Sequence, residues 1–260
     1  MHILDAICRS KRLEIARQKE TTPLADLKNS LNFQPRKKVS FKQALSNSAS
    51  GIIAEFKRNS PSKGWINQEA DAAQIVRSYE EAGAAAISCL TDEPFFGGSF
   101  TDFAKARAAI KQIPLLRKDF ILDEYQLYQS KLMGADVVLL IAACLTTDEI
   151  IRFTAIAHAL DMEVLLEIHD ETELVSICPD MDVIGVNNRN LKTFVTDIRH
   201  TIELASRIPG QFLKISESGI SSPETVIELR QAGFRGFLMG ENFMKTSNPG
   251  ESLREFIRKL

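Results

Sequence analysis

Eight short apolar runs recur from residue 51 onward, and longer stretches with helical periodicity separate them. The runs cover residues 51–56, 85–90, 114–120, 136–142, 163–168, 182–187, 212–218 and 236–240. Each intervening stretch, such as QEADAAQIVRSYEEAG, is long enough for a helix that crosses back over a sheet. Eight strand-then-helix units favour parallel strands with right-handed crossovers, and eight such strands close into a barrel with a filled interior. We therefore predict an α/β fold, the (β/α)₈ TIM barrel.

An open, doubly wound sheet is the main alternative fold, but no GxGxxG turn follows the first apolar run. The length of 260 residues suits one barrel domain, although two small domains would also fit. We expect a single domain over residues 1–260, with the barrel over 51–260.

Residues 1–50 lie outside the repeat and are predicted to form an N-terminal helical extension. Ile3, Leu4, Ile7, Cys8 and Ile15 follow helical spacing, and residues 40–46 resemble a second short helix. We expect the extension to pack on the barrel, where it could also cover the active-site mouth, rather than to form an independent domain or a partner-binding arm.

Composition restricts the partners and the compartment. The net charge of −2 offers no global attraction to nucleic acid or to an anionic membrane. No run of about 18 apolar residues predicts a membrane span, and the charged N-terminus does not resemble a signal peptide. The four cysteines form no CxxC pair, and no His/Cys/Asp cluster has metal-ligand spacing. We expect a cytoplasmic protein with reduced thiols and no bound metal.

Charged and polar residues end at least five of the predicted strands. Catalytic groups of this fold project from the carboxyl ends of the strands. Because side chains alternate along a strand, Glu55 and Lys57 point to the same side, and Lys118 and Glu167 each lie two residues beyond an apolar residue of the same parity. Any one such charge could form a simple salt bridge or cap a helix. So many charged residues at one end of the barrel predict a ligand site, because burying them is otherwise costly. Lys118 and Glu167 are placed to bias each other's ionisation, as a general acid and a general base require. The remaining candidates at strand ends are Asn187, Arg189, Glu217 and Ser218.

Two glycine-containing turns predict a phosphate site. Ser218 and Gly219 follow the seventh strand, and Gly240 and Glu241 follow the eighth. The loops after these strands often bind phosphate in this fold, because glycines let backbone N–H groups approach an anion closely. The loop over residues 58–65 combines basic, hydroxyl and flexible residues, which suit either a lid or a solvated surface loop.

At these residues the chain resembles the indole-3-glycerol phosphate synthase family of tryptophan biosynthesis. The matching segments follow one another in order and cover nearly every strand end: IIAEFKRNSPSKG (52–64), SCLTDEPFFGGSF (88–100), PLLRKDFILDEYQ (114–126), EVLLEIHDETEL (163–174), IGVNNRNL (184–191), ISESGI (215–220) and LMGENFM (238–244). The resemblance implies a carboxy-lyase that closes the ring of 1-(2-carboxyphenylamino)-1-deoxyribulose 5-phosphate, with loss of carbon dioxide and water, to give indole-3-glycerol phosphate. It also implies that no cofactor is needed.

The resemblance also implies catalytic roles. Lys118 is the general acid that protonates the ketose oxygen, and Glu167 is the general base of the later dehydration. Lys57 contacts the substrate and could supply a proton in one of these steps. Glu55 and Asn187 position the substrate hydroxyls and the second acid–base group, and Glu217 supports them.

Further binding roles follow from the same resemblance. Arg189 lies near the substrate carboxylate, and the phosphate is held by Ser218, Gly219, Gly240 and Glu241. Glu241 stands where some relatives have serine, so we expect it to offer its backbone N–H and to turn its carboxylate away. Gly97 stands where some relatives have asparagine, which removes a side-chain contact.

Three further residues are candidates for substrate binding. Phe96 and Phe120 are walls for the anthranilate ring or ordinary core, and Ser60 belongs to the loop after the first strand. The exterior helices carry no mark of assembly, and we expect a monomer or a weak homo-oligomer.

Two other functions stay open at this point. A phosphoribosylanthranilate isomerase shares the pathway, but it typically uses a cysteine near the end of the first strand, where this chain has Glu55 and Lys57. A non-enzymatic barrel that binds a phosphorylated metabolite would predict erosion of the charged strand ends, and they are intact.

Overall fold

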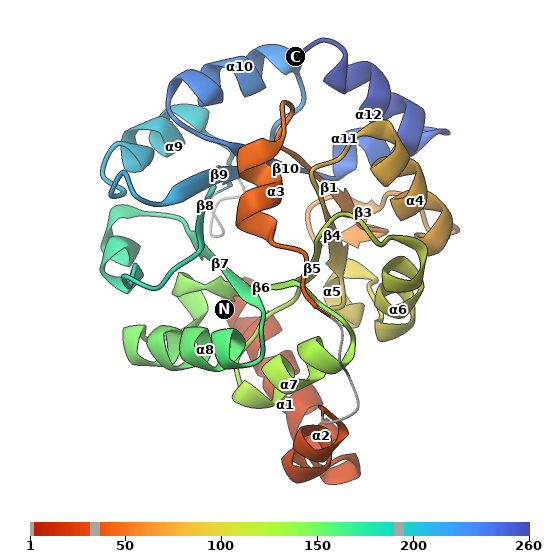
Figure 1. Ribbon diagram of the computed structural model, residues 1–260, viewed down its shortest axis with the longest axis vertical. Helices are drawn as coiled ribbons and strands as arrows, with labels where there is room; N and C mark the ends of the chain where they lie inside the picture. Colours follow the sequence, from red (N-terminus) through yellow and green to blue (C-terminus); the bar gives the residue numbers. More distant parts are fainter. Residues whose placement is uncertain (1–2, 32–36, 190–194) are drawn as a thin grey trace.

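Eight parallel strands pair edge to edge into a closed barrel in the computed structural model, which describes residues 3–31, 37–189 and 195–260 (Figure 1). The order around the barrel is β1-β10-β9-β8-β7-β6-β5-β4, and β4 pairs with β1 to complete the ring. The strands are β1 (Ile52–Phe56), β4 (Ala86–Leu90), β5 (Leu115–Lys118), β6 (Val137–Ile141), β7 (Glu163–Ile168), β8 (Val183–Asn187), β9 (Leu213–Glu217) and β10 (Gly236–Met239). Each lies within its predicted apolar run, so the predicted barrel is confirmed.

A ring of helices surrounds the strands (Figure 1). Its members are α4 (Ala72–Ala82), α6 (Phe100–Ala109), α7 (Glu124–Leu132), α8 (Thr147–Ala159), α9 (Ile198–Ala205), α10 (Pro223–Gln231) and α12 (Pro249–Ile257). After β7 a 3₁₀ helix, η3 (Glu171–Ser176), takes the place of an α-helix. Thr146 and Ser222 cap α8 and α10, because their side chains accept hydrogen bonds from backbone N–H groups of the first turn.

Short helices lengthen three of the loops at the carboxyl ends of the strands. They are α5 (Glu93–Phe96) after β4, η2 (Ala142–Cys144) after β6 and α11 (Glu241–Met244) after β10. The loop after β1 contains a small antiparallel hairpin of β2 (Asn59–Ser60) and β3 (Gly64–Trp65). These additions build up one end of the barrel.

Alternation along the strands divides the core into two layers. In β1, Ile52, Ala54 and Phe56 pack outward against the helices, whereas Ile53 packs with the residues that fill the barrel interior. Glu55 shares the inward parity of Ile53. The strand pattern therefore directs the Glu55 side chain into the barrel at the carboxyl ends of the strands.

The N-terminal helices lie at both ends of the barrel. These are α1 (Ile3–Thr21), α2 (Leu24–Ser30) and α3 (Phe41–Asn47), and α1 and α2 both contact α7. Figure 1 shows α3 lying across the centre of the barrel. Phe41 and Leu45 of α3 are fully buried and pack on the interior layer, so this helix closes the end of the barrel opposite the built-up loops.

The cysteines are free thiols, and Cys8 on α1 lies 3.5 Å (Sγ–Sγ) from Cys144 on η2. The sequence spacing gave no sign of this proximity. In the described ranges, no helix combines the length and the apolar character needed to cross a membrane.

Candidate active site

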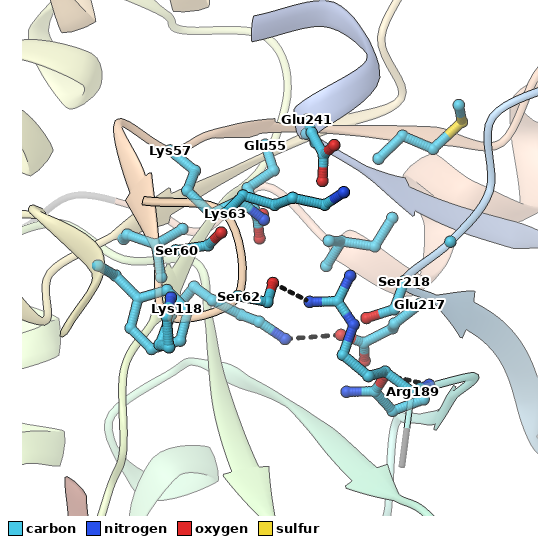
Figure 2. A pocket seen from close by; sticks show the side chains of 18 of the residues that line it. Glu55, Lys57, Ser60, Ser62, Lys63, Lys118, Arg189, Glu217, Ser218 and Glu241 are labelled. Carbon is cyan, nitrogen blue, oxygen red and sulfur yellow. Dashed lines mark hydrogen bonds and ion pairs between the residues drawn. The ribbon is translucent and has the colours of Figure 1, made fainter. Parts of the chain in front are cut away.

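The carboxyl ends of the strands surround a cavity of about 390 Å³ (Figure 2). Every site residue predicted from the sequence lines it: Glu55, Lys57, Ser60, Phe96, Lys118, Phe120, Glu167, Asn187, Arg189, Glu217, Ser218, Gly219, Gly240 and Glu241. The strand ends and the loops after them bring these residues together from segments up to 186 positions apart, from Glu55 to Glu241. Two residues of the matching motif after β8, Asn190 and Leu191, lie outside the described residues.

One ammonium group lies between two carboxylates in this cavity. Lys118 Nζ is 2.9 Å from Glu167 Oε2 and 2.6 Å from Glu217 Oε2. Burial alone would lower the pKa of Lys118, but the two carboxylates and Glu55 outweigh it and raise that pKa above its usual value. Lys118 therefore stays protonated at neutral pH, which is the form a general acid requires.

The two carboxylates beside Lys118 have opposite pKa shifts. Burial raises the pKa of both, but Lys118, His169 and Asn187 together bring that of Glu167 well below its usual value. Burial dominates for Glu217, and the neighbouring charges of Glu167 and Glu55 add to it, raising its pKa to about 7. Glu167 is therefore ionised, whereas Glu217 can hold a proton next to Lys118.

His169 forms an ion pair with Glu167 and was not among the site residues predicted from the sequence. Its Nε2 lies 3.1 Å from Glu167 Oε1, and its Nδ1 lies 3.4 Å from Glu173 Oε2. Burial lowers the pKa of His169, but the two carboxylates outweigh burial and raise it to about 10. Asn187 Nδ2 donates to the same Oε1 at 3.0 Å. The sequence signal that could have identified His169 is its position two residues after Glu167, which is the spacing of side chains on one side of a strand.

Glu55 and Lys57 form a second ion pair at the end of β1. Lys57 Nζ lies 2.7 Å from Glu55 Oε1, and Ser88 Oγ donates to Glu55 Oε2 at 3.4 Å. Gly240 has no room for a side chain, because an added Cβ would lie 2.8 Å from Glu55 Oε1. Glycine at 240 thus lets the backbone after β10 approach the carboxylate of β1.

The loop after β9 has a left-handed backbone that is uncommon for a residue with a side chain. Ser218 and Gly219 have φ values of 69° and 68°. Asn188, a second residue missed from the sequence, holds this turn by donating from Nδ2 to the Ser218 carbonyl at 2.6 Å, and it accepts from Ser216 Oγ at 3.2 Å. The turn at Ser218 and Gly219 is therefore fixed by a buried amide.

Two buried hydrogen-bond donors on cavity-lining residues have no partner among the described residues. They are Ser60 Oγ on the hairpin and Nε of Arg189. Arg189 NH1 donates to Ser62 Oγ at 3.1 Å, which joins the loop after β8 to the hairpin (Figure 2). Unsatisfied buried donors are costly, so both atoms are suited to an incoming polar ligand.

Glu241 differs from the sequence expectation. Its side chain is half-buried and extends along the cavity wall in the direction of Lys63, so it does not turn away from the cavity (Figure 2). Lys63 and Lys245 line the same cavity. The two ammonium groups offset the negative charge that Glu241 adds there.

An apolar wall completes the cavity. The rings of Phe96 and Phe120 have centroids 6.0 Å apart at an interplanar angle of 38°. Ile3, Leu4 and Ile7 of α1 also line the cavity, so the N-terminal helix contributes to the mouth. Their helical spacing predicted a packed helix face, and a position over the active-site mouth was one of the places expected for this extension.

The site as a whole combines basic groups for an acidic ligand, an acid–base pair and an apolar slot. Among the described residues, no group of three His, Cys, Asp or Glu side chains could hold a metal ion. The arrangement is therefore suited to proton transfer on a phosphorylated ligand that also carries an apolar ring.

Comparison with known proteins gives a consistent result along the chain. A family model described as indole-3-glycerol phosphate synthase matches residues 4–256. A protein of that name from Bacteroides thetaiotaomicron is 53% identical over 258 residues, covering 99% of this chain and 98% of the relative. Another from Burkholderia multivorans is 44% identical over 256 residues, covering 96% and 97%. A solved structure of 3-hexulose-6-phosphate synthase covers 81% of this chain and 99% of its own, with a TM-score of 0.65 at 12% identity, and shares the fold alone.

Proposed function

The chain belongs to the indole-3-glycerol phosphate synthase family, and on that premise we propose how the residues of its cavity divide the work. The reaction is that of a carboxy-lyase of tryptophan biosynthesis. It closes the ring of 1-(2-carboxyphenylamino)-1-deoxyribulose 5-phosphate and yields indole-3-glycerol phosphate, carbon dioxide and water. The full-length match decides against the isomerase and against the non-enzymatic barrel. The observation that carries the proposal is the Lys118 ammonium between Glu167 and Glu217.

Lys118 is the general acid of ring closure in this proposal. As the carboxylate-bearing aromatic carbon attacks the ketose carbon, the carbonyl oxygen gains a proton from Lys118. Loss of carbon dioxide then restores the aromatic ring. Its raised pKa keeps Lys118 protonated, and Glu217, 2.6 Å away, can return a proton to it.

Glu167 is the general base of the dehydration. Its depressed pKa keeps it ionised, and the contacts to His169 and Asn187 fix its orientation. Glu55 and Asn187 position the hydroxyl groups of the chain between the two anionic ends. Lys57 contacts the substrate from the rim, where it is part of the ion pair with Glu55.

The two ends of the substrate bind at different parts of the cavity. Arg189 and Ser60 contact the carboxylate end, supported by their unpartnered buried atoms, while Phe96 and Phe120 pack on the aromatic ring. The backbone N–H groups of the Ser218–Gly219 and Gly240–Glu241 turns hold the phosphate. Lys63 and Lys245 balance the charge of Glu241, which could otherwise repel this anion.

We further propose that the protein acts in the cytoplasm as a monomer or a weak homo-oligomer and binds neither nucleic acid nor a membrane. Its own ammonium and carboxylate groups supply every proton transfer in the scheme, so the proposal includes no cofactor and no metal.

The proposal is tested by turnover of the purified protein. With the carboxyphenylamino substrate and no added nucleotide, product should appear as indole absorbance and fluorescence, and a chelator should leave the rate unchanged. A folded preparation that forms no indole product would overturn the assignment. A rate that falls with chelator and recovers with a divalent cation would overturn the metal-free scheme alone.

A further inference from the structure

We propose that Lys11 on α1 is a positioning residue that sets the two aromatic walls, Phe96 and Phe120, for the ring of the substrate. The inference rests on the proposed function, because it takes these two rings as the contact surface for the anthranilate group. Lys11 does not line the cavity and has no part in the proton transfers described above.

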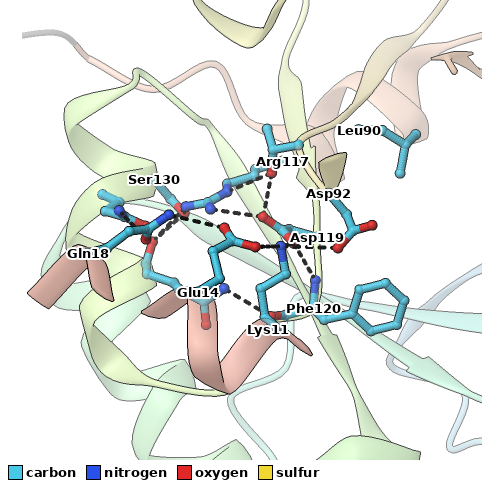
Figure 3. A network of polar contacts seen from close by, with 12 residues as sticks. Lys11, Glu14, Gln18, Leu90, Asp92, Arg117, Asp119, Phe120 and Ser130 are labelled. Carbon is cyan, nitrogen blue, oxygen red and sulfur yellow. Dashed lines mark hydrogen bonds and ion pairs between the residues drawn. The ribbon is translucent and has the colours of Figure 1, made fainter. Parts of the chain in front are cut away.

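Lys11 is a buried lysine with ion pairs to three carboxylates (Figure 3). It is 1% exposed, and its Nζ lies 3.1 Å from Asp92, 3.0 Å from Asp119 and 2.8 Å from Glu14. Burying an ammonium is costly unless it is paired, and these partners come from the loops after β4 and β5 and from α1 itself. A lysine in this setting indicates a specific structural task.

One of its partners, Asp92, begins the segment that carries Phe96. Oδ2 of Asp92 accepts a hydrogen bond from the Phe95 backbone N–H at 3.0 Å and thereby caps α5, whose last residue is Phe96. Oδ1 of the same carboxylate contacts Lys11. Among the described residues, this is the one ion pair of Asp92.

The other buried partner, Asp119, holds Phe120 directly. Its Oδ1 contacts Lys11 and also accepts from the Phe120 backbone N–H at 2.8 Å. Its Oδ2 is held by Thr91 Oγ1 at 2.5 Å and Arg117 NH2 at 2.9 Å. A single ammonium therefore bridges the two carboxylates that fix the starts of both aromatic segments.

Removal of the ammonium would unbalance this cluster in a defined way. Asp119 would keep its ion pair with Arg117, but Asp92 would lose its cation and would face the like charge of Asp119. Burial and, to a smaller extent, the charge of Asp119 already raise the pKa of Asp92. The two loops would then separate, and the gap between the rings would change. The same helix places Ile7, one turn before Lys11, in the cavity wall. The part of the wall that α1 forms would therefore shift together with the two loops.

The test compares Lys11→Met with Lys19→Met. Lys19 also lies on α1 and also ties it to the barrel, through an ion pair of 2.7 Å to Asp123, but it does not reach the aromatic segments. We expect Lys11→Met to raise KM for the carboxyphenylamino substrate by about tenfold or more with a smaller change in kcat, by analogy with the roughly 10- to 100-fold losses for groups that orient metal ligands. Lys19→Met should stay within about twofold of the wild type, as expected of an exposed ion pair.

A phosphate probe separates positioning from general damage. The inhibition constant of inorganic phosphate should be unchanged in Lys11→Met, because the phosphate turns belong to other strands. Lys11→Arg should recover most of the lost affinity. If Lys11→Met does not fold, Asp92→Asn replaces it, since asparagine keeps the cap on α5 but weakens the contact to Lys11, and KM should rise in the same direction.

Two results would overturn the inference: a KM for Lys11→Met, or for Asp92→Asn in its place, no higher than that of Lys19→Met, or a phosphate inhibition constant that rises in parallel with KM. Failure of the proposed function itself is a separate result, because the wild type would then show no turnover in the same assay.

Discussion

At the residue scale, two glutamates share one lysine yet differ in how firmly they hold a proton. Glu167 receives charge or hydrogen bonds from Lys118, His169 and Asn187, whereas Glu217 has Lys118 alone and one buried oxygen, Oε1, without a hydrogen-bond partner among the described residues. The environment thus keeps Glu167 ionised and raises the pKa of Glu217 to about 7.

This difference predicts a pH-dependent effect of Glu217→Gln on stability. The folded-state pKa of Glu217 is raised from 4.5 to about 7, so the folded protein binds its proton more tightly than the unfolded chain. That contribution is complete below pH 4.5 and is lost as the pH rises toward 7, at a cost on the order of 3 kcal/mol. Glutamine does not ionise. The melting temperature of Glu217→Gln relative to the wild type should therefore be higher at pH 8 than at pH 5.

The matched control is Glu255→Gln, on the exposed face of α12. Its melting temperature should differ from the wild type by the same small amount at both pH values. A Glu217→Gln difference that is equal at pH 5 and pH 8, or larger at pH 5, would contradict the raised pKa.

At the element scale, the N-terminal segment closes the barrel at both ends. Helix α1 contributes Ile3, Leu4 and Ile7 to the mouth, and α3 fills the opposite end with Phe41 and Leu45. The cap of α3 is tied to the barrel, because Ser40 Oγ donates to Glu163 Oε1 at 2.6 Å. The two helices therefore lie at different places, one at the cavity and one against the interior layer at the opposite end.

Phe41→Ala tests the task of α3. Phe41 is fully buried against the interior layer, so its truncation leaves a cavity and should lower the free energy of unfolding by about 3–5 kcal/mol. Activity of the folded fraction should change by less than about twofold, because the substrate site lies at the other end of the barrel. Gln43→Ala, on the exposed face of the same helix, should leave both unchanged. A large loss of kcat in folded Phe41→Ala would place α3 in the catalytic apparatus.

Strand periodicity in the sequence was enough to predict the barrel and the strand-end residues that face its interior. Alternation directed Glu55, Lys118 and Glu167 into the barrel, and the order of the apolar runs specified the ring of strands. It could not predict contacts between segments that are distant in sequence and have no period. The Lys11–Asp119 ion pair, the Asn188–Ser218 hydrogen bond and the closure by α3 are of that kind. The expectation that the Glu241 carboxylate turns away was wrong for a related reason. The side chain extends toward Lys63, which belongs to a loop distant in sequence.

At the scale of the whole molecule, local charge matters more than net charge. The chain carries −2 overall, yet the mouth gathers Lys57, Lys63, Lys118, Arg189 and Lys245 among its carboxylates. Such a cluster attracts a small dianionic ligand without giving the surface as a whole a positive field. The fold therefore gathers these five cationic side chains at one end of the barrel.

We also propose that residues 1–260 fold as one domain, with residues 1–50 as an integral extension of the barrel over 51–260. Buried ion pairs of Lys11 and the burial of Phe41 tie the extension to the strands. Urea unfolding should then give one transition, with the same midpoint by far-UV circular dichroism and by labelling of the buried thiol of Cys8. Labelling of Cys8 well below the midpoint of the dichroism transition would mean that the extension unfolds alone.

In the proposed mechanism the Lys118 ammonium, at the carboxyl end of β5, donates the proton of ring closure, and the test is single-turnover formation of indole-3-glycerol phosphate by Lys118→Met. The comparison is Lys105→Met, which removes an exposed lysine paired with Asp71 on the outer helices. With both proteins folded by circular dichroism, Lys118→Met should be slower by at least about 10²- to 10⁴-fold, and Lys105→Met should match the wild type. Turnover by Lys118→Met within a few-fold of Lys105→Met would show that the proton comes from another group.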